Sequence, residues 1–132
     1  HGRSGWKLVS VRVDKNFFEL LRHSSAKVMV MSNVLNLIKK LVGEDEGNES
    51  LFNVVSNFLD FLVTAKEDHL SLAECLVLLR ILHSLGYVRH EPEFGLPLVS
   101  QEIDPDFLEQ IAPRRVKMIE LINESLKTTH LT

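Results

Sequence analysis

Two pairs of neighbouring basic residues are the side chains of this sequence best suited to bind a charged ligand. They are Lys39 with Lys40 and Arg114 with Arg115. Since successive residues of a helix point about 100° apart, each pair can direct one cation into a groove and the other toward solvent. Such a cation can bind phosphates or the carboxylates of an acidic peptide, and arginine can do so with two parallel hydrogen bonds. Both pairs are also compatible with a solvated surface, so the pattern leaves the two interpretations open.

The sequence contains no motif typical of a catalytic or metal site. It lacks a Gly-rich phosphate loop, a G-x-S-x-G turn and an H-E-x-x-H pair. The one cysteine, Cys75, lies within an apolar segment, where a buried structural thiol is expected rather than a nucleophile. None of the six histidines stands four residues from another or joins a cysteine cluster. We therefore predict no catalytic residue, no metal and no cofactor, and we expect that the protein is not an enzyme.

The charge of the chain is unevenly distributed. The formal net charge is −3, but residues 1–40 carry eight Lys or Arg against two acids, while residues 41–74 carry one Lys against eight acids. A basic first third favours an anionic partner such as nucleic acid. A charged, solvated surface without such a partner is the alternative.

The hydrophobic pattern predicts helices for most of the 132 residues. Apolar residues at spacings of three and four indicate a helix from a cap at Ser24 or Ser25 to about Val42, and a second helix after Asn48. A third begins at a capping box, Ser71 to Glu74, and runs to about Leu85. It is apolar on more than one stripe, so we expect it to be the central helix, with Arg80 and His83 at its rim, Cys75 in its core and Gly86 ending it in a left-handed conformation.

Two more helices are predicted near the end of the sequence. Asp104 and Pro105 are typical of an N-cap and a first helical position, and they predict a short helix to Ile111. A last helix begins at Pro113 and ends near Lys127. We expect its inward face to consist of Val116, Ile119, Ile122 and Leu126. Residues 87–103 form a long connection with two prolines.

Residues 5–13 are the only segment with the alternation of a β-strand. A strand cannot satisfy its backbone groups alone, so we predict that the chain is part of a longer protein whose other strands precede it. The predicted organisation is one strand and a linker in residues 1–14 and an all-α domain in residues 15–132. That domain is a helical bundle of about five to six helices.

Three stretches together resemble a known family. They are residues 2–10 (GRSGWKLVS) with 16–21 (NFFELL), residues 79–87 (LRILHSLGY) and residues 121–127 (LINESLK). In this order and spacing, across nearly the whole chain, they resemble the bacterial recombination mediator RecO. The resemblance implies an N-terminal OB-fold, of which this chain holds only the last strand, and a helical C-terminal domain. Some members carry a four-cysteine zinc site after the Leu-Gly-Tyr helix, but residues 88–103 here contain no cysteine, so zinc is not expected.

The resemblance also implies the function and the partners. Members of the family bind single- and double-stranded DNA, promote annealing, and act with RecR and the single-strand-binding protein to load RecA in the bacterial cytoplasm. Most of the DNA surface would belong to the OB-fold. In this chain Arg3, Lys7 and Arg12 are the DNA-binding candidates. The candidates for binding the acidic, hydrophobic tail of the single-strand-binding protein, which rest on charge and helix ends, are Lys39, Lys40, Arg80, Arg114 and Arg115.

Two other classes of protein remain possible at this point. The chain could be a helical protein-interaction module of an unrelated regulator, without DNA binding. It could also be part of an enzyme whose catalytic half lies elsewhere, although no motif favours this. A strand-and-turn pattern in the sequence upstream of His1 would favour the mediator over both.

Overall fold

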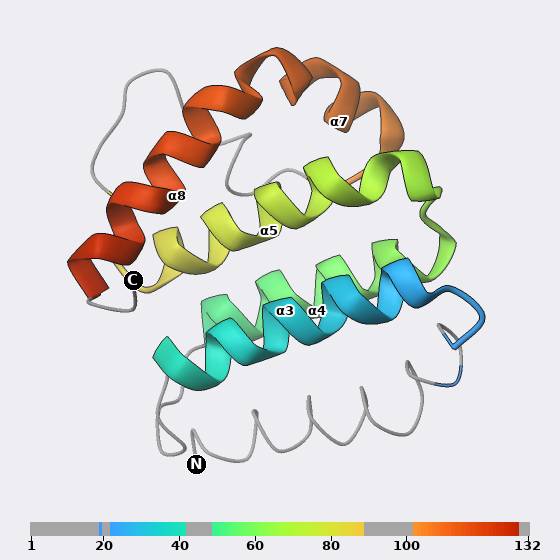
Figure 1. The fold of residues 1–132 in the computed structure, drawn as a ribbon, viewed down its shortest axis with the longest axis horizontal. Coiled ribbons are helices and arrows are strands. Elements are labelled where there is room, and N and C mark those ends of the chain that lie inside the picture. The colour runs from blue at the N-terminus through green and yellow to red at the C-terminus, as the bar shows by residue number, and fades with distance from the viewer. Residues whose placement is uncertain (1–18, 20–21, 42–48, 89–101, 130–132) are drawn as a thin grey trace.

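The fold of the chain is given by a computed structural model (Figure 1). The structure describes residues 19, 22–41, 49–88 and 102–129. Every regular element within these residues is helical, so the mostly helical fold is confirmed. The elements in chain order are α3 (Ser25–Leu41), α4 (Glu49–Thr64), the 3₁₀ turn η2 (Glu67–His69), α5 (Leu70–Ser84), α7 (Pro105–Ile111), the 3₁₀ turn η3 (Ala112–Arg114) and α8 (Arg115–Thr129). The predicted strand over residues 5–13 lies outside the described residues. The total number of helices therefore stays a prediction.

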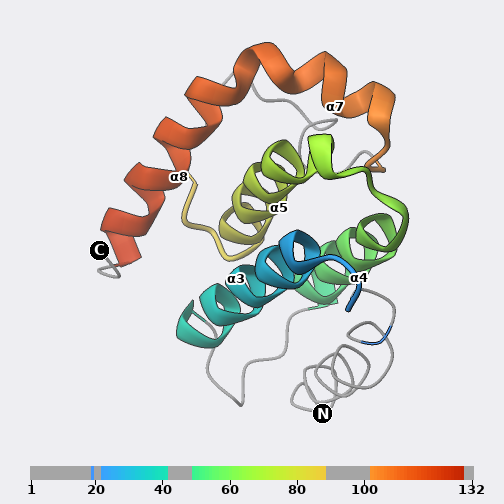
Figure 2. The same cartoon turned by 45° about the vertical axis from the view of Figure 1, so that its right-hand side comes forward.

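Helices α3 and α4 lie on one side of α5, and α7 and α8 lie on the other (Figures 1 and 2). Lys27 Nζ, near the start of α3, donates to the carbonyl of Val63 at the end of α4 over 3.1 Å, so these two helices are antiparallel. The hydroxyls of Ser50 and Ser84 are 3.3 Å apart, which places the start of α4 beside the end of α5. The three helices thus alternate in direction, as short connections require.

Helix α8 packs along α5 and runs parallel to it. Its first residue, Arg115, donates a hydrogen bond from its guanidinium to Ser71 Oγ, at the start of α5, over 2.5 Å. Since α3 is antiparallel to α4 and α4 is antiparallel to α5, the helices α3, α5 and α8 all point the same way (Figure 1). The pair Lys39 and Lys40 at the end of α3 and the pair Arg114 and Arg115 at the start of α8 therefore lie at opposite ends of the bundle.

Helix α5 is the centre of the fold, as the sequence predicts. It packs against α3, α4 and α8, and it has the longest set of buried residues among the described helices. These are Leu70, Ala73, Cys75, Leu76, Val77, Leu79, Arg80, Ile81 and Leu82. The burial of Cys75 confirms the predicted structural thiol. A helix that is apolar on several stripes can satisfy them only by having neighbours on several sides.

The predicted ends of three helices are confirmed. Ser24 Oγ accepts a hydrogen bond from the backbone N–H of Lys27 at 3.3 Å and so caps α3. Asp104 Oδ1 accepts one from the N–H of Phe107 at 2.8 Å and caps α7, with Pro105 at the first position. After α5, Gly86 has a φ of 82°, a left-handed conformation that glycine adopts without steric cost.

The predicted capping box of α5 is wrong. The N-cap is His69, two residues before Ser71, the helix begins at Leu70, and the His69 side chain makes no capping bond. The two side chains that would have formed the box contact other helices instead. Ser71 accepts from Arg115 of α8, and Glu74 accepts from Asn33 Nδ2 of α3 at 3.1 Å. A 3₁₀ turn leads directly into α5 and supplies its start by backbone bonding.

The predicted inward face of α8 is wrong in its first half. Val116 is 70% exposed and Ile119 is 40% exposed. The buried residues on the helix are instead Met118, Leu121, Ile122 and Ser125. Ser125 could join an apolar stripe because its hydroxyl donates to the carbonyl of Leu121, one turn earlier, over 2.7 Å. Because Ser125 is polar, it interrupts the apolar pattern of the face that is buried. The face through Val116 and Ile119 is apolar without interruption, so the sequence pattern favours that face.

Candidate functional site

The five residues predicted to bind a protein partner do not form one site. Lys39 and Lys40 lie in the last turn of α3, at one end of the bundle. Arg114 and Arg115 lie where α7 turns into α8, at the other end (Figure 1). Arg80 lies on the central helix between them. The DNA-binding candidates Arg3, Lys7 and Arg12 are outside the described residues.

A structural role is sufficient to explain Lys39 and Lys40. Both are exposed, and both are in the last turn of a helix. Cations at this place stabilise a helix by interacting with its unpaired carbonyls and the negative end of its dipole. Their presence therefore needs no ligand.

The helix dipole does not account for Arg114 and Arg115. Both are exposed, and they lie at the start of α8, whose first turn carries no acidic residue. Cations near a helix N-terminus are unfavourable for the helix, because they meet the positive end of its dipole. The hydrogen bond from Arg115 to Ser71 links α8 to α5 and offsets part of that cost. The helix dipole therefore does not favour cations at this place, in contrast to the place of Lys39 and Lys40.

An exposed apolar face adjoins the two arginines. Val116 follows Arg115 directly, and Ile119 is three residues after Val116 and four after Arg115, so the three side chains are neighbours on the helix surface. We refer to Arg114, Arg115, Val116 and Ile119 as the α8 corner. Exposed apolar side chains beside a cation are typical of a surface that binds a protein or peptide. The sequence pattern indicates the two cations as binding candidates, but its spacing predicts Val116 and Ile119 to lie in the core.

Arg80 does not lie at the rim of its helix, and that prediction is wrong. The residue is 4% exposed, and its guanidinium carbon lies 5.7 Å from the centre of the Phe107 ring of α7. Burial lowers the pKa of Arg80 to about 10. The side chain thus joins α5 to α7 through a cation–π contact in the interior. A partner approaching from solvent could not reach it, whereas its predicted neighbour His83 is exposed.

The Cys75 thiol is affected by the nearby α8 corner. Burial raises its pKa above the ordinary value of 9.0, and this effect exceeds the opposite effect of the positive charge of Arg115. A thiol that keeps its proton is a poor nucleophile.

Within the described residues no group of three or more His, Cys, Asp or Glu side chains is placed to hold a metal ion.

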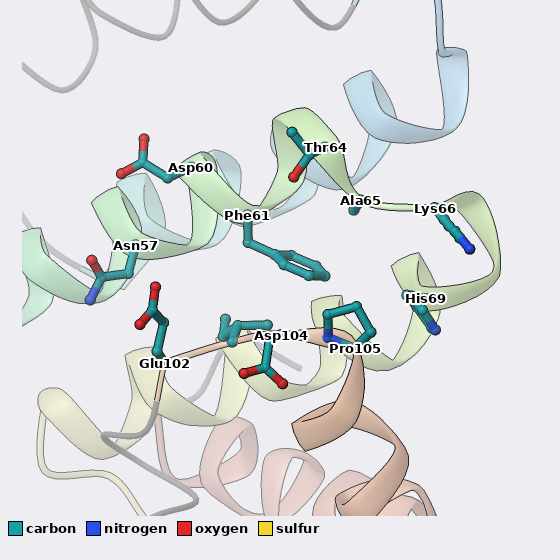
Figure 3. Close-up of a pocket in the computed structure, with 11 residues that line it drawn as sticks. Asn57, Asp60, Phe61, Thr64, Ala65, Lys66, His69, Glu102, Asp104 and Pro105 are labelled. Atoms are coloured by element: carbon teal, nitrogen blue, oxygen red, sulfur yellow. The ribbon is translucent and has the colours of Figure 1, made fainter.

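A pocket lies between α4 and the segment that leads into α7 (Figure 3). Its volume is about 360 Å³. One wall is a face of α4, and the other is residues 102–105. The lining residues are Asn57, Asp60, Phe61, Thr64, Ala65, Lys66, His69, Glu102, Ile103, Asp104 and Pro105. The sequence predicts the cap at Asp104 but not this pocket, because the position of residues 102–105 beside α4 leaves no trace in local spacing.

Comparison with known proteins gives no family to which the chain can be assigned. Neither a family model, nor a curated protein, nor a solved structure matches it. None of the described helices is both long enough and apolar enough to cross a membrane.

Proposed function

We propose that this chain is the helical part of a RecO-like mediator of DNA repair and recombination, and that the α8 corner binds the acidic, hydrophobic tail of a single-strand-binding protein. The observation that carries the proposal is the position of exposed Val116 and Ile119 beside Arg114 and Arg115. The mostly helical fold of the described residues is compatible with it.

The chemistry of the corner suits such a tail. Carboxylates of the tail can accept charge-assisted hydrogen bonds from the arginines. The N-terminus of α8 adds a favourable potential for the same negative charge. The apolar end of the tail would cover Val116, which is 70% exposed and otherwise meets water. Both halves of an acidic, hydrophobic peptide thus find a complement within two turns of helix.

The remaining parts of the proposed function belong to the longer protein. DNA binding and annealing are assigned mainly to a preceding OB-fold, with Arg3, Lys7 and Arg12 at its edge. RecR and RecA are the further partners, the compartment is the bacterial cytoplasm, and no reaction is catalysed. Lys39 and Lys40 are not needed for the tail in this proposal, and Arg80 contributes only by holding α5 against α7.

The test is a titration of the chain with a nine-residue peptide that ends in three acids followed by two apolar residues. We expect Arg115→Ala and Val116→Ser each to weaken binding by about two- to fivefold, the range of one exposed ion pair or one half-covered apolar side chain. Lys40→Ala is the matched control, since it removes a cation at the far end of the bundle. Equal losses in all three variants would mean that binding follows overall charge and not the corner.

A second experiment separates the mediator from a helical interaction module without DNA binding. The protein extended upstream to include the predicted barrel is titrated with a single-stranded oligonucleotide at several salt concentrations. We expect binding that weakens as salt rises, because each phosphate contact releases counterions. Peptide binding without any DNA binding by the extended protein would favour the interaction module.

A further inference from the structure

The pocket between α4 and residues 102–105 has the composition of a site for a cationic side chain. Three acidic residues, Asp60, Glu102 and Asp104, are among its lining residues, against one lysine, Lys66. The Asp104 carboxylate caps α7 and the Asp60 carboxylate points away from residues 102–105, so Glu102 is the acid whose carboxylate faces the opposite wall (Figure 3). The excess of negative charge is opposite in sign to the α8 corner. A seven-residue helix, α7, separates the two places in the chain. An acidic peptide that binds the corner is therefore not a suitable occupant of the pocket.

The pocket also contains an aromatic ring in a position to contact a ligand. Phe61 is half-buried, and its ring extends from α4 toward Pro105 on the opposite wall (Figure 3). The face of an aromatic ring attracts a guanidinium or ammonium group. The apolar wall formed by Phe61, Ile103 and Pro105 suits the aliphatic stem that carries such a group. The lining thus provides separate places for the stem and the head of one long basic side chain.

The charges of the pocket lie at opposite ends. Glu102 turns its carboxylate toward α4 at the end near Asn57, whereas Lys66 and His69 lie at the other end (Figure 3). A single cationic head would lie near Glu102. Lys66 could then donate to a carbonyl of the backbone that carries the side chain. A polyamine, which is cationic along its whole length, would place a second charge near Lys66 and is disfavoured.

His69, at the end of the pocket away from Glu102, has one ring nitrogen without a hydrogen bond to any described residue. Its Nδ1 atom is buried, and it has no hydrogen-bond partner in the part of the chain that the structure describes. Buried polar atoms without a partner are uncommon, since each costs free energy. Because this atom is buried and lies at the end away from Glu102, it is not among the contacts proposed for the ligand.

We propose that this pocket binds an arginine or lysine side chain of a partner polypeptide. At about 360 Å³ it is near the lower limit of small-ligand pockets, and this volume suits one side chain rather than a helix. The guanidinium or ammonium group contacts the Glu102 carboxylate and the Phe61 ring, and the stem lies against Pro105. The proposal does not depend on the partner of the α8 corner.

The test is a titration of the ¹⁵N-labelled chain with the blocked tripeptide Ala-Arg-Ala, followed by amide chemical shifts. We expect changes at Asn57, Phe61 and Thr64, and none for the tripeptide in which neutral citrulline replaces arginine. Citrulline keeps the shape of the side chain and removes its charge. Equal binding of the two peptides, or changes confined to residues outside the pocket, would overturn the proposal.

Two variants with matched controls locate the contacts. We expect Glu102→Gln and Phe61→Leu each to weaken the arginine peptide by about two- to fivefold, the range of one exposed ion pair or one cation–π contact. The controls are Glu109→Gln, an exposed acid of α7, and Phe52→Leu, another half-buried phenylalanine of α4. Losses in the controls equal to those in the variants would refute the assignment. Tighter binding of spermidine than of the peptide would refute a polypeptide as the occupant.

Discussion

Replacing Asp104 tests whether one hydrogen bond holds the segment between the pocket and the core. Its carboxylate accepts from the N–H of Phe107 at 2.8 Å and satisfies one of the unpaired donors at the start of α7. Removing an N-cap aspartate typically costs about 1 kcal/mol. Helix α7 has seven residues, so it is too short to be stable alone and unfolds with the domain that buries Phe107, Leu108 and Ile111. The cost should therefore appear in global unfolding.

The assay is urea unfolding of Asp104→Ala and Asp104→Asn, followed by circular dichroism at 222 nm. For an m-value of about 2 kcal/mol per molar, a loss of about 1 kcal/mol moves the midpoint by about 0.5 M. Asparagine caps a helix as well as aspartate does, so Asp104→Asn should retain the midpoint to within about 0.2 M. An equal loss in both variants would show that the charge of Asp104 matters and that the capping bond does not. No loss in Asp104→Ala would refute the cap.

Three further stability predictions follow from single residues. Gly86→Ala should cost about 1 kcal/mol from its left-handed backbone alone, since an added Cβ meets no atom within 4 Å, and Gly86→Asn should cost less in the same urea assay. Arg80→Lys should cost about 1 kcal/mol, and less in a Phe107→Leu background, as a double-mutant cycle would measure. Because the pKa of Cys75 is raised in the folded protein, the unfolded chain loses the thiol proton at a lower pH, and the free energy of unfolding should fall as the pH rises above about 9. Cys75→Ala should reduce this fall. An unchanged dependence of stability on pH in Cys75→Ala would contradict the prediction.

Local signals were sufficient where one residue determines the backbone around it. Asp104 with Pro105, Ser24 and Gly86 each act within three residues of their own position, and each is found where the sequence predicts it. The apolar stripes of α3, α4 and α5 were also sufficient to predict a helical core. Such features follow from spacing and from the preferences of single residues.

Sequence patterns gave wrong predictions where a side chain can bond either within its own helix or to another helix. Ser71 and Glu74 match a capping box, but contacts with Arg115 and Asn33 on neighbouring helices replace it. The face of α8 was misassigned because a buried serine can satisfy its hydroxyl within its own helix. The pocket beside Phe61 depends on how residues 102–105 lie beside α4, and local spacing contains no information about that arrangement.

The common direction of α3, α5 and α8 gives the described bundle an electrical polarity. Each helix contributes about half a positive elementary charge at its start and half a negative one at its end. Three such ends coincide, because the start of α8 lies beside the start of α5 and α3 points the same way. The α8 corner lies at this end of the bundle, together with the end of the antiparallel helix α4, whose negative charge offsets one of the three positive ends. An anionic partner that binds the α8 corner would thus meet the starts of these helices together with the two arginines, and raising the ionic strength should slow its association more than its release.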